Sequence, residues 1–430
     1  MLGAGGSVAT SAQKTIVILG AMDTKSAELL FVRDQVLKEG CCAVILDFSV
    51  GSRPLIQGDI TCEEVARAGG GRIEDLWGTP DRVTKNKVVT DGAISIVRQR
   101  YAEGSLHGIL CVGGAGGTLI GTDIARALPF GVPKFVVSSN AAARGFSERY
   151  FGTKDITMMH TVVDVAGVTD MLRTLLIQAA AGVCAMARAT AVAAPRSERD
   201  RPVVALCELM IEAEAVRFLK EALEDRGYEV NVFMATGVGD TAMEELIGEG
   251  RFDAVVDLSP GSIIDSLVAG TRIACPERLE TAGRQGIPQI IAPGGLDFIA
   301  PAKSKYKPEY EVRKSYEPDS IRKLLRSSAK EVEGAAQVIA EKLNKAKGPV
   351  RILIPTRGWS TVSGSGRPLD DPEADQAFIV CLNKCLRPDI PVIEVEARID
   401  EATFARAVVD SLDDMVTSSR RTMQTTVPTQ

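Results

Sequence analysis

This sequence has few histidines and no CxxC cysteine pair. Many metal centres and hydrolytic triads depend on these residues. The chain has two histidines, His107 and His160, and neither stands beside a serine or cysteine elbow motif, so a hydrolase triad has little support. Its nine cysteines include no CxxC pair, which disfavours a zinc site. This odd, scattered set also argues against a disulfide framework and favours a reducing cytoplasm.

Basic clusters and long apolar runs are missing as well. The net charge is −6, and no stripe of lysine and arginine is visible that could neutralise the phosphates of a nucleic acid. No apolar run approaches the roughly 20 residues that a membrane span needs. The opening segment lacks the basic start and apolar stretch of a signal peptide. These absences predict a cytoplasmic protein with no membrane partner and no direct nucleic-acid partner.

Aromatic residues are few, at 5%, whereas glycine is plentiful, with 40 residues. This balance suits an α/β protein with many tight turns between strands and helices. Short apolar strands without polar alternation predict parallel sheets that are covered on both faces. The rhythm of strand, turn and helix that begins near 15 begins again near 203. We therefore predict two Rossmann-like lobes, each a mostly parallel sheet with helices on both faces.

The length of 430 residues also favours two domains. A shift from small residues to charges and proline over 188–202 predicts the boundary between them. Within the second domain, a long charged helix is expected around 317–344. The predicted divisions are a flexible lead over 1–13, a first lobe over 14–195, a second lobe over 202–413 and a disordered tail over 414–430.

A glycine-packed turn joins a buried strand to a helix in the stretch ILCVGGAGGTLIGTDIA, residues 109–125. Backbone amides at such a turn can converge on an anion, and the following helix directs its positive end to the same place. One glycine would suffice for close packing of helix and strand, so the cluster favours a phosphate site over a tight turn alone. The predicted phosphate loop consists of Gly113, Gly114, Ala115, Gly116, Gly117 and Thr118.

Known phosphate-loop fingerprints fit this turn poorly. A Walker A loop has lysine where Thr118 stands, and the dinucleotide-binding pattern fails at Leu119. The turn also looks like the GGDGT turn of phosphofructokinase-like and NAD-kinase-like enzymes, but Ala115 replaces the aspartate that is central to phosphoryl transfer there. We therefore expect a nucleotide to bind here without an evident catalytic acid or base beside it.

The segment after the first strand, GAMDTKSAE, offers a second set of candidates. Lys25 can pair with phosphate, Thr24 is a hydrogen-bond donor, and Asp23 can hold Mg²⁺ directly or through water. The alternative is ordinary helix capping by Asp23 or Thr24 with Lys25 in solvent. Both roles are compatible with a ligand at the start of the helix.

Two further strand ends complete the predicted edge. Asp47 ends the second strand, where an acid often accepts from ribose hydroxyls; a turn-stabilising aspartate is the alternative. Ser138, Ser139 and Asn140 end the strand after the glycine turn, where they could cap a helix or touch the ligand.

Four carboxylates cluster in the second lobe, in the stretch RPLDDPEADQAF. The Asp-Pro pair at 371–372 favours the start of a helix, with acids in the first turn stabilised by the helix dipole. The functional alternative is a second ligand pocket that uses these acids. The four carboxylates are Asp370, Asp371, Glu373 and Asp375.

Six ordered segments together resemble one family. They are GAMDTKSAEL, VGGAGGT, GTKDITMMHTVVDVAG, APGGLDF, PTRGWS and DDPEAD, and they are similar to the Tm-one-like ATP-binding domain family over about residues 14–413. The resemblance implies two Rossmann-like lobes with ATP bound at the first. Carried over by motif, the nucleotide contacts fall on Asp23, Thr24, Lys25 and the 113–118 turn, with a contribution from Thr153 and Asp155 in the 152–157 segment.

The resemblance also implies partners, because a plant member of the family forms dimers and inhibits a viral replication protein by contact. We therefore expect a homodimeric ATP-binding protein, with or without Mg²⁺, whose ligand regulates lobe closure, assembly or a protein partner. The rival hypothesis is an ATP-dependent transferase or ligase with a small metabolite between the lobes. A third is an interaction scaffold with a vestigial site.

Overall fold

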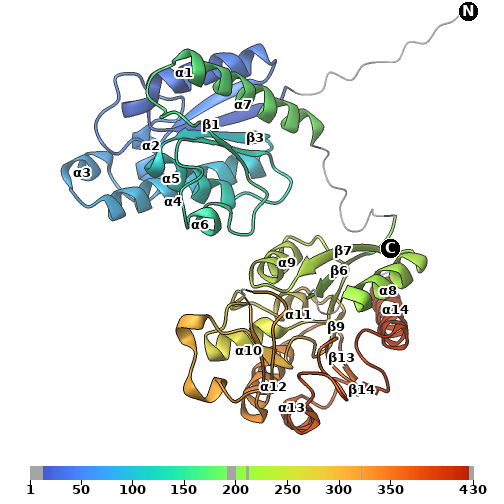
Figure 1. Ribbon diagram of the computed structural model, residues 1–430. Coiled ribbons are helices and arrows are strands. Elements are labelled where there is room, and N and C mark those ends of the chain that lie inside the picture. Colours follow the sequence, from blue (N-terminus) through green and yellow to red (C-terminus); the bar gives the residue numbers. More distant parts are fainter. Residues whose placement is uncertain (1–12, 191–199, 210–212, 321, 426–430) are drawn as a thin grey trace, which may run out of the picture. The chain divides into compact units, whose positions relative to one another are not determined.

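The computed structural model describes residues 13–190, 200–209, 213–320 and 322–425. The chain divides into two compact units, Met1–Ala193 and Ala194–Gln430, called here the N-terminal and C-terminal lobes (Figure 1). Nearly all of the predicted flexible lead and most of the predicted boundary lie outside the described residues. Each lobe contains a parallel sheet with helices on both faces, which confirms the predicted fold class.

Five parallel strands form the sheet of the N-terminal lobe, in the order β2-β1-β3-β4-β5. The inner strands β1, β3 and β4 are buried and largely apolar because both of their faces are covered. In β1, Ile16 and Ile18 face one core, while Val17 and Leu19 face the other. The strands are β1 (Thr15–Gly20), β2 (Cys42–Asp47), β3 (Gly108–Gly113), β4 (Lys134–Ser138) and β5 (Thr157–His160).

Helices cover both faces of this sheet. Figure 1 shows α1 and α7 together on one face, and α2, α4 and α5 on the other. Local capping fixes several of their starts: Asp81 accepts from amides in the first turn of α4, and Thr169 does so for α7. The helices are α1 (Met22–Lys38), α2 (Cys62–Ala68), α3 (Ile73–Gly78), α4 (Arg82–Ala102), α5 (Ala115–Arg126), α6 (Ser147–Phe151) and α7 (Asp170–Ala189).

Glycine is required where α2 crosses α4. A Cβ on Gly92 would lie 1.9 Å from the carbonyl oxygen of Val65 and 2.8 Å from the amide nitrogen of Gly69, and neither backbone group can rotate away. We expect Gly92→Ala to push the helices apart and to lower the free energy of unfolding of the N-terminal lobe by about 2 to 3 kcal/mol. Urea unfolding followed by the fluorescence of Trp77, which lies in this lobe, measures the change.

The matched control is Gly78→Ala, because a Cβ on Gly78 would meet no atom within 4 Å. A background that carries Trp359→Phe removes the tryptophan signal of the other lobe, since the chain has two tryptophans. Equal stability of the Gly92→Ala and Gly78→Ala variants would contradict the close-packing argument.

The C-terminal lobe repeats the strand order of the N-terminal lobe and adds one strand. Its six parallel strands run β14-β13-β9-β8-β6-β7, so β7-β6-β8-β9-β13 corresponds to β2-β1-β3-β4-β5. This agrees with the repeated rhythm of strand, turn and helix in the sequence. The strands are β6 (Val203–Glu208), β7 (Glu229–Met234), β8 (Ala254–Asp257), β9 (Gln289–Ile291), β13 (Val350–Pro355) and β14 (Val392–Val395).

Helices again lie on both faces: α8 and α14 cover one, and α9, α10, α11, α12 and α13 cover the other. Asp371 caps α13 by accepting from the amide of Ala374, and Pro372 begins the helix, so the capping interpretation of the Asp-Pro pair is confirmed. The helices are α8 (Ala213–Asp225), α9 (Val238–Gly248), α10 (Gly261–Val268), α11 (Thr281–Gln285), α12 (Ala329–Leu343), α13 (Pro372–Cys385) and α14 (Ala402–Thr425).

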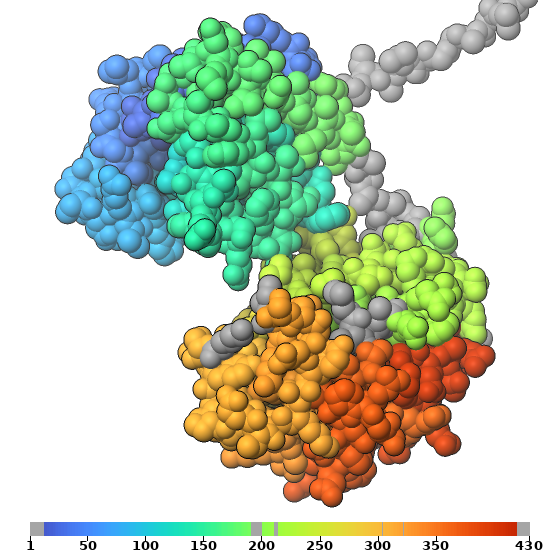
Figure 2. All heavy atoms as spheres, viewed as in Figure 1, coloured from blue at the N-terminus to red at the C-terminus, as the bar shows by residue number. Residues whose placement is uncertain are grey.

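A small antiparallel sheet, in the order β10-β12-β11, places its strand β12 within the region predicted as one long helix. The 317–344 prediction is corrected: α12 begins only at Ala329, because Ser328 and Glu331 form a reciprocal capping box. In Figure 2 the orange segment that includes this sheet lies on the surface of the lobe. Its elements are β10 (Phe298–Ile299), η3 (Lys303–Lys305), η4 (Pro308–Tyr310), β11 (Ser315–Tyr316) and β12 (Leu324–Arg326).

The C-terminal segment is more ordered than its polar sequence predicts. Helix α14 continues to Thr425, so the disordered tail predicted over 414–430 is corrected for its first twelve residues. Met415 and Val416 are buried in the core beneath α8 and α14, and they continue the apolar face begun by Leu412. Residues 426–430 lie outside the described residues.

Helix α7 is, among the described residues, the one helix long and apolar enough to cross a membrane. Seven of its residues are buried, and Leu172, Leu176 and Val183 among them pack in the core shared with α1 and the sheet. The opposite face is exposed and carries Arg173. A core helix passes the same test of length and composition, and this packing gives α7 that role.

Candidate functional site

The carboxyl ends of β1 and β3 form the natural ligand crevice of the N-terminal lobe. These strands are neighbours in the sheet, and the helices that follow them, α1 and α5, cover opposite faces. In sheets with this strand order, ligands bind where the connections diverge. Gly20 ends β1 and Gly113 ends β3, so the segments 21–25 and 114–118 leave the sheet from neighbouring positions.

Helix α5 begins within the glycine turn and has no side-chain cap. Gly114 is its N-cap residue, and the first hydrogen bond of the turn runs from the Thr118 amide to the Gly114 carbonyl, at 2.8 Å. Within the part of the chain that the structure describes, the amides of Ala115, Gly116 and Gly117 form no hydrogen bond with the protein. Ala115 and Gly116 are exposed. The positive end of α5 is therefore open to an anion.

The glycines in and beside this turn serve two purposes. A Cβ on Gly113 would lie 3.0 Å from the Cα of Gly117, and one on Gly121 only 2.1 Å from the Sγ of Cys111, so these two glycines let α5 pack closely against β3. A Cβ on Gly116, by contrast, would meet no atom within 4 Å. Packing accounts for Gly113 and Gly121 but not for Gly116, whose missing side chain keeps the amides accessible.

Lys25 is linked to the glycine turn through the residues that follow β4 and β5. Its Nζ donates to the carbonyl of Val165, while the hydroxyl of Ser139 donates to Asp164 at 2.9 Å. The hydrogen bond from Ser139, then the amide of Val165 and the charge of Lys25, hold the pKa of Asp164 below its ordinary value. A Cβ on Gly114 would lie 3.7 Å from the same Ser139 hydroxyl. One polar cluster thus borders the open amides.

Asp23 already uses part of its carboxylate within the protein. Its Oδ2 accepts from the amides of Gly51 and Ser52, at 3.0 and 3.2 Å, and so ties the loop after β2 to the start of α1. Thr24, next to it, is exposed. No group of three metal-ligating side chains occurs among the described residues. A magnesium ion beside Asp23 would therefore take most of its ligands from phosphate and water.

Asp47 is buried rather than presented to a ligand, and the predicted ribose contact is corrected. Its Oδ1 accepts from the amides of Met22 and Ser49, at 3.0 and 2.9 Å, and the residue is 0% exposed. Burial raises the pKa of Asp47 against the lowering effect of these hydrogen bonds. The segment around Gly58 and Ile60 covers the end of β2, so Asp47 serves as the turn-stabilising residue of the alternative interpretation.

The side chains of Thr118, Ser138 and Asn140 lie at the predicted carboxyl edge of the sheet, but their hydrogen bonds are to other residues of the lobe. The Ser138 and Thr118 hydroxyls are 2.6 Å apart, and the Thr118 hydroxyl donates to the Gly114 carbonyl at 2.8 Å. Ser138 accepts from the Asn140 amide, and the Asn140 side chain donates to the Tyr150 hydroxyl at 2.5 Å. These residues hold the glycine turn in place, and Thr118 and Ser138 are fully buried beneath it.

The structure does not bring Thr153 and Asp155 to this edge, so their predicted nucleotide contacts are corrected. Asp155 forms an ion pair with the buried Lys134 at 2.8 Å and accepts from the Gly131 amide at 2.9 Å. Lys134 begins β4, and Thr153 and Asp155 precede β5. Residues that precede parallel strands lie at the amino-terminal edge of the sheet, opposite the glycine turn.

Two residues at the carboxyl edge of the N-terminal sheet were not predicted from the sequence. Asp164 accepts from Ser139 beside Lys25, and Ser49 accepts from the Asp23 amide at 2.9 Å. Both stand a few residues past the carboxyl end of a strand, Ser49 after β2 and Asp164 after β5. Extending the strand-end rule to every strand of the lobe would have found them.

Family models match both halves of the chain. Residues 14–192 match the model described as "Uncharacterised protein family (UPF0261) N-terminal domain", and residues 201–416 match the model of its C-terminal domain. The chain belongs to the UPF0261 family. The two matches follow the N-terminal and C-terminal lobes described above.

Relatives of this UPF0261 protein occur in bacteria and plants. A "UPF0261 protein" of Clostridium tetani is 35% identical over 405 residues, covering 94% of this chain and 99% of the relative. A Brucella suis protein of the same family is 31% identical, with 93% and 95% covered. The tomato "ToMV resistance protein Tm-1(GCR237)" is 30% identical over 84% of this chain and 48% of its own length. The resemblance drawn from the six segments is therefore confirmed at the level of the family.

Proposed function

We propose that the N-terminal lobe of this UPF0261 protein binds ATP at the carboxyl ends of β1 and β3, with the triphosphate on the amides of residues 115–117. The observation that carries the proposal is the set of three amides at the uncapped start of α5 that have no acceptor among the described residues, beside a Gly116 that packing does not require. Lys25 supplies positive charge at the same edge.

The charge balance of this edge also supports an anionic ligand. Lys25 donates to a carbonyl, not to a carboxylate, so its charge is only partly balanced by the nearby Asp164. Asp23 offers one carboxylate oxygen beyond the one that holds Gly51 and Ser52. We propose that Mg²⁺ enters together with ATP, with Asp23 as its one carboxylate contact.

We further propose that the nucleotide regulates assembly and is not consumed. Among the described residues, the acid in the polar cluster beside the open amides is Asp164, and its carboxylate is held by Ser139 and Val165 instead of being available as a general base. The tomato relative is named for resistance to a virus, which is consistent with a role in binding a protein partner. A homodimer is the assembly that we expect to respond.

Titration calorimetry with ATP and Mg²⁺ tests the site directly. We expect one site per chain and a stabilisation of about 2.7 kcal/mol when free ATP is a hundred times its dissociation constant, measured from the thermal unfolding of the N-terminal lobe. ADP should bind and adenosine should bind far more weakly, because the phosphates supply the contacts. No heat with no thermal shift, or adenosine as tight as ATP, would contradict the proposal.

The same samples also distinguish a nucleotide-binding module from an enzyme that consumes ATP. A pocket in the C-terminal lobe is large enough for a small metabolite, which keeps an ATP-dependent transferase or ligase as the second candidate. Steady release of ADP or AMP that depends on an added metabolite favours that enzyme. Slow turnover that no metabolite accelerates favours the nucleotide-binding module.

A further inference from the structure

The C-terminal lobe contains a cavity of about 690 Å³ that the nucleotide proposal does not use. Its inner wall is the carboxyl edge of the sheet: Leu209 follows β6, and Met234 ends β7. Its outer wall comes from β10, from β12 and from the segments beside them. The cavity therefore lies at the carboxyl edge of the sheet, over β6 and β7, and open α/β sheets bind ligands at this edge. The volume is that of a pocket for one small organic molecule.

Apolar groups make up most of the cavity wall. Leu209, Phe298 and Leu324 present large side chains, and Met234, two alanines and two prolines add further apolar surface. Phe298 in β10 and Leu324 in β12 are also buried in one hydrophobic cluster, so this wall belongs to the packed body of the lobe. A wall of this kind takes up an aromatic or branched aliphatic group.

Among the described residues, the charged side chains that line the cavity are all basic: Arg272, Arg322 and Lys323. Arg272 is buried and paired with Asp265, its Nε 2.9 Å from Oδ2, and its guanidinium lies over the ring of Phe298. Arg272 therefore shapes the wall as one half of a compensated pair.

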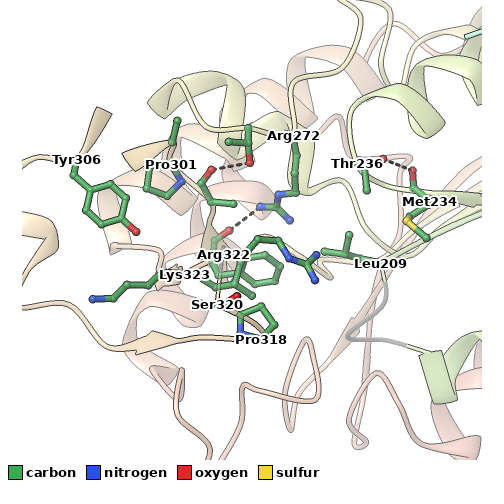
Figure 3. Close-up of a pocket in the computed structure, with 15 residues that line it drawn as sticks. Leu209, Met234, Thr236, Arg272, Pro301, Tyr306, Pro318, Ser320, Arg322 and Lys323 are labelled. Atoms are coloured by element: carbon green, nitrogen blue, oxygen red, sulfur yellow. Dashed lines mark hydrogen bonds between the residues drawn. The ribbon is translucent and has the colours of Figure 1, made fainter. Parts of the chain in front are cut away.

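Arg322 is the cation best placed to hold an anion. Asp319 forms an ion pair with Arg322 and accepts from both its backbone amide and its Nε, at 2.8 and 2.6 Å, which fixes the exposed Arg322 side chain at its base. The two terminal nitrogens make no hydrogen bond with the described residues. Figure 3 shows the guanidinium of Arg322 projecting toward Leu209, with Lys323 extending on the other side beneath Tyr306. An arginine fork held in this way matches a carboxylate in two hydrogen bonds.

We propose that this cavity is a second ligand site, for a small organic carboxylate with an aromatic or branched aliphatic body. The body would pack against Leu209, Phe298 and Leu324, and the carboxylate would bind Arg322, with Lys323 adding charge at the rim. Every described residue that lines the cavity belongs to the C-terminal lobe, so this proposal does not rest on the proposed binding of ATP to the N-terminal lobe.

Two fluorescent probes test the two parts of this site. 8-Anilinonaphthalene-1-sulfonate has an aromatic body and one negative charge, and N-phenyl-1-naphthylamine is its neutral counterpart. We expect both to bind the full chain, and Arg322→Gln to weaken the charged probe about tenfold without affecting the neutral one. The matched control is Arg217→Gln, which removes an exposed arginine paired with Glu221 on α8, away from the cavity. That control should change neither affinity.

A second variant tests the apolar part without touching a charge. Thr236 is exposed at the mouth of the cavity, so Thr236→Trp should fill the entrance and weaken both probes at little risk to folding. Competition by aromatic carboxylates, but not by the matching amides, would support the carboxylate assignment. The proposal is overturned if the charged probe does not bind, if Arg322→Gln and Arg217→Gln have equal effects, or if Thr236→Trp leaves both affinities unchanged.

Discussion

Gly116→Asp is expected to raise the dissociation constant for ATP by at least about 100-fold while the N-terminal lobe stays folded. The new carboxylate would stand among the three open amides of α5 and would repel the triphosphate at a distance where two like charges interact by more than 1 kcal/mol even in water. The variant should fold because a Cβ at this position meets no atom within 4 Å and an aspartate near a helix start is itself favourable.

The control for this variant adds the same charge elsewhere in the lobe. Gly78→Asp places an aspartate at the exposed end of α3, where a Cβ also meets no atom within 4 Å. Calorimetry should show ATP binding of normal strength in the Gly78→Asp variant. In the Gly116→Asp variant, binding should be too weak to measure. Gly116→Ala separates charge from bulk and should weaken binding less than Gly116→Asp. Normal ATP binding in a folded Gly116→Asp variant would place the nucleotide elsewhere.

Signals that are local in sequence predicted the glycine turn at the carboxyl edge of the sheet. The glycine turn is a strand, a turn and a helix start within seventeen residues, so its amides could be located without knowing the rest of the fold. The capping box of Ser328 and Glu331 is equally local, and reading it would have placed the start of α12 correctly. The repeated strand order of the lobes follows from the same local rhythm.

Features that depend on distant segments could not be predicted in this way. Asp47 has the position of a ribose-binding acid, but the chain around Gly58 and Ile60 folds over it and turns it into a buried turn residue. The family motif predicted Asp155 as a nucleotide contact. In the structure Asp155 precedes β5 and pairs with Lys134 at the amino-terminal edge of the sheet. Which end of a strand a residue occupies decides its role, and strand bounds are the least certain part of a sequence-based prediction.

A buried ionic cluster in the C-terminal lobe is the clearest feature with no sequence signal. Arg278 is 1% exposed, and it faces three buried acids that are 21 to 38 residues away in sequence. Its Nε lies 3.2 Å from Asp240, its Nη1 3.7 Å from Glu244, and it also pairs with Asp257. This cluster joins the end of β8 to α9 and to the segment before α11, so it holds these parts of the C-terminal lobe together.

Arg278→Met should lower the free energy of unfolding of the C-terminal lobe by about 3 to 5 kcal/mol, because it leaves buried carboxylates without their cation. Urea unfolding followed by Trp359 in a Trp77→Phe background reads this lobe alone, and Trp359 is 1% exposed within its core. Arg217→Met, which removes an exposed arginine, should cost less than about 0.5 kcal/mol. If Arg278→Met lowers the free energy of unfolding by less than about 1 kcal/mol, the three buried acids do not need the Arg278 charge to stay buried.

The pH dependence separates this electrostatic loss from a simple loss of packing. Burial already raises the pKa of Glu244 above its ordinary value even with Arg278 present, and removing the cation must raise it further. A carboxyl whose pKa is higher in the folded than in the unfolded state makes the folded state bind more protons, so stability rises as the pH falls toward that pKa. The deficit of Arg278→Met should therefore shrink between pH 8 and pH 5.5, and Glu244→Gln in that background should remove part of it. A deficit that stays constant with pH would show that Arg278 matters for its volume and not for its charge.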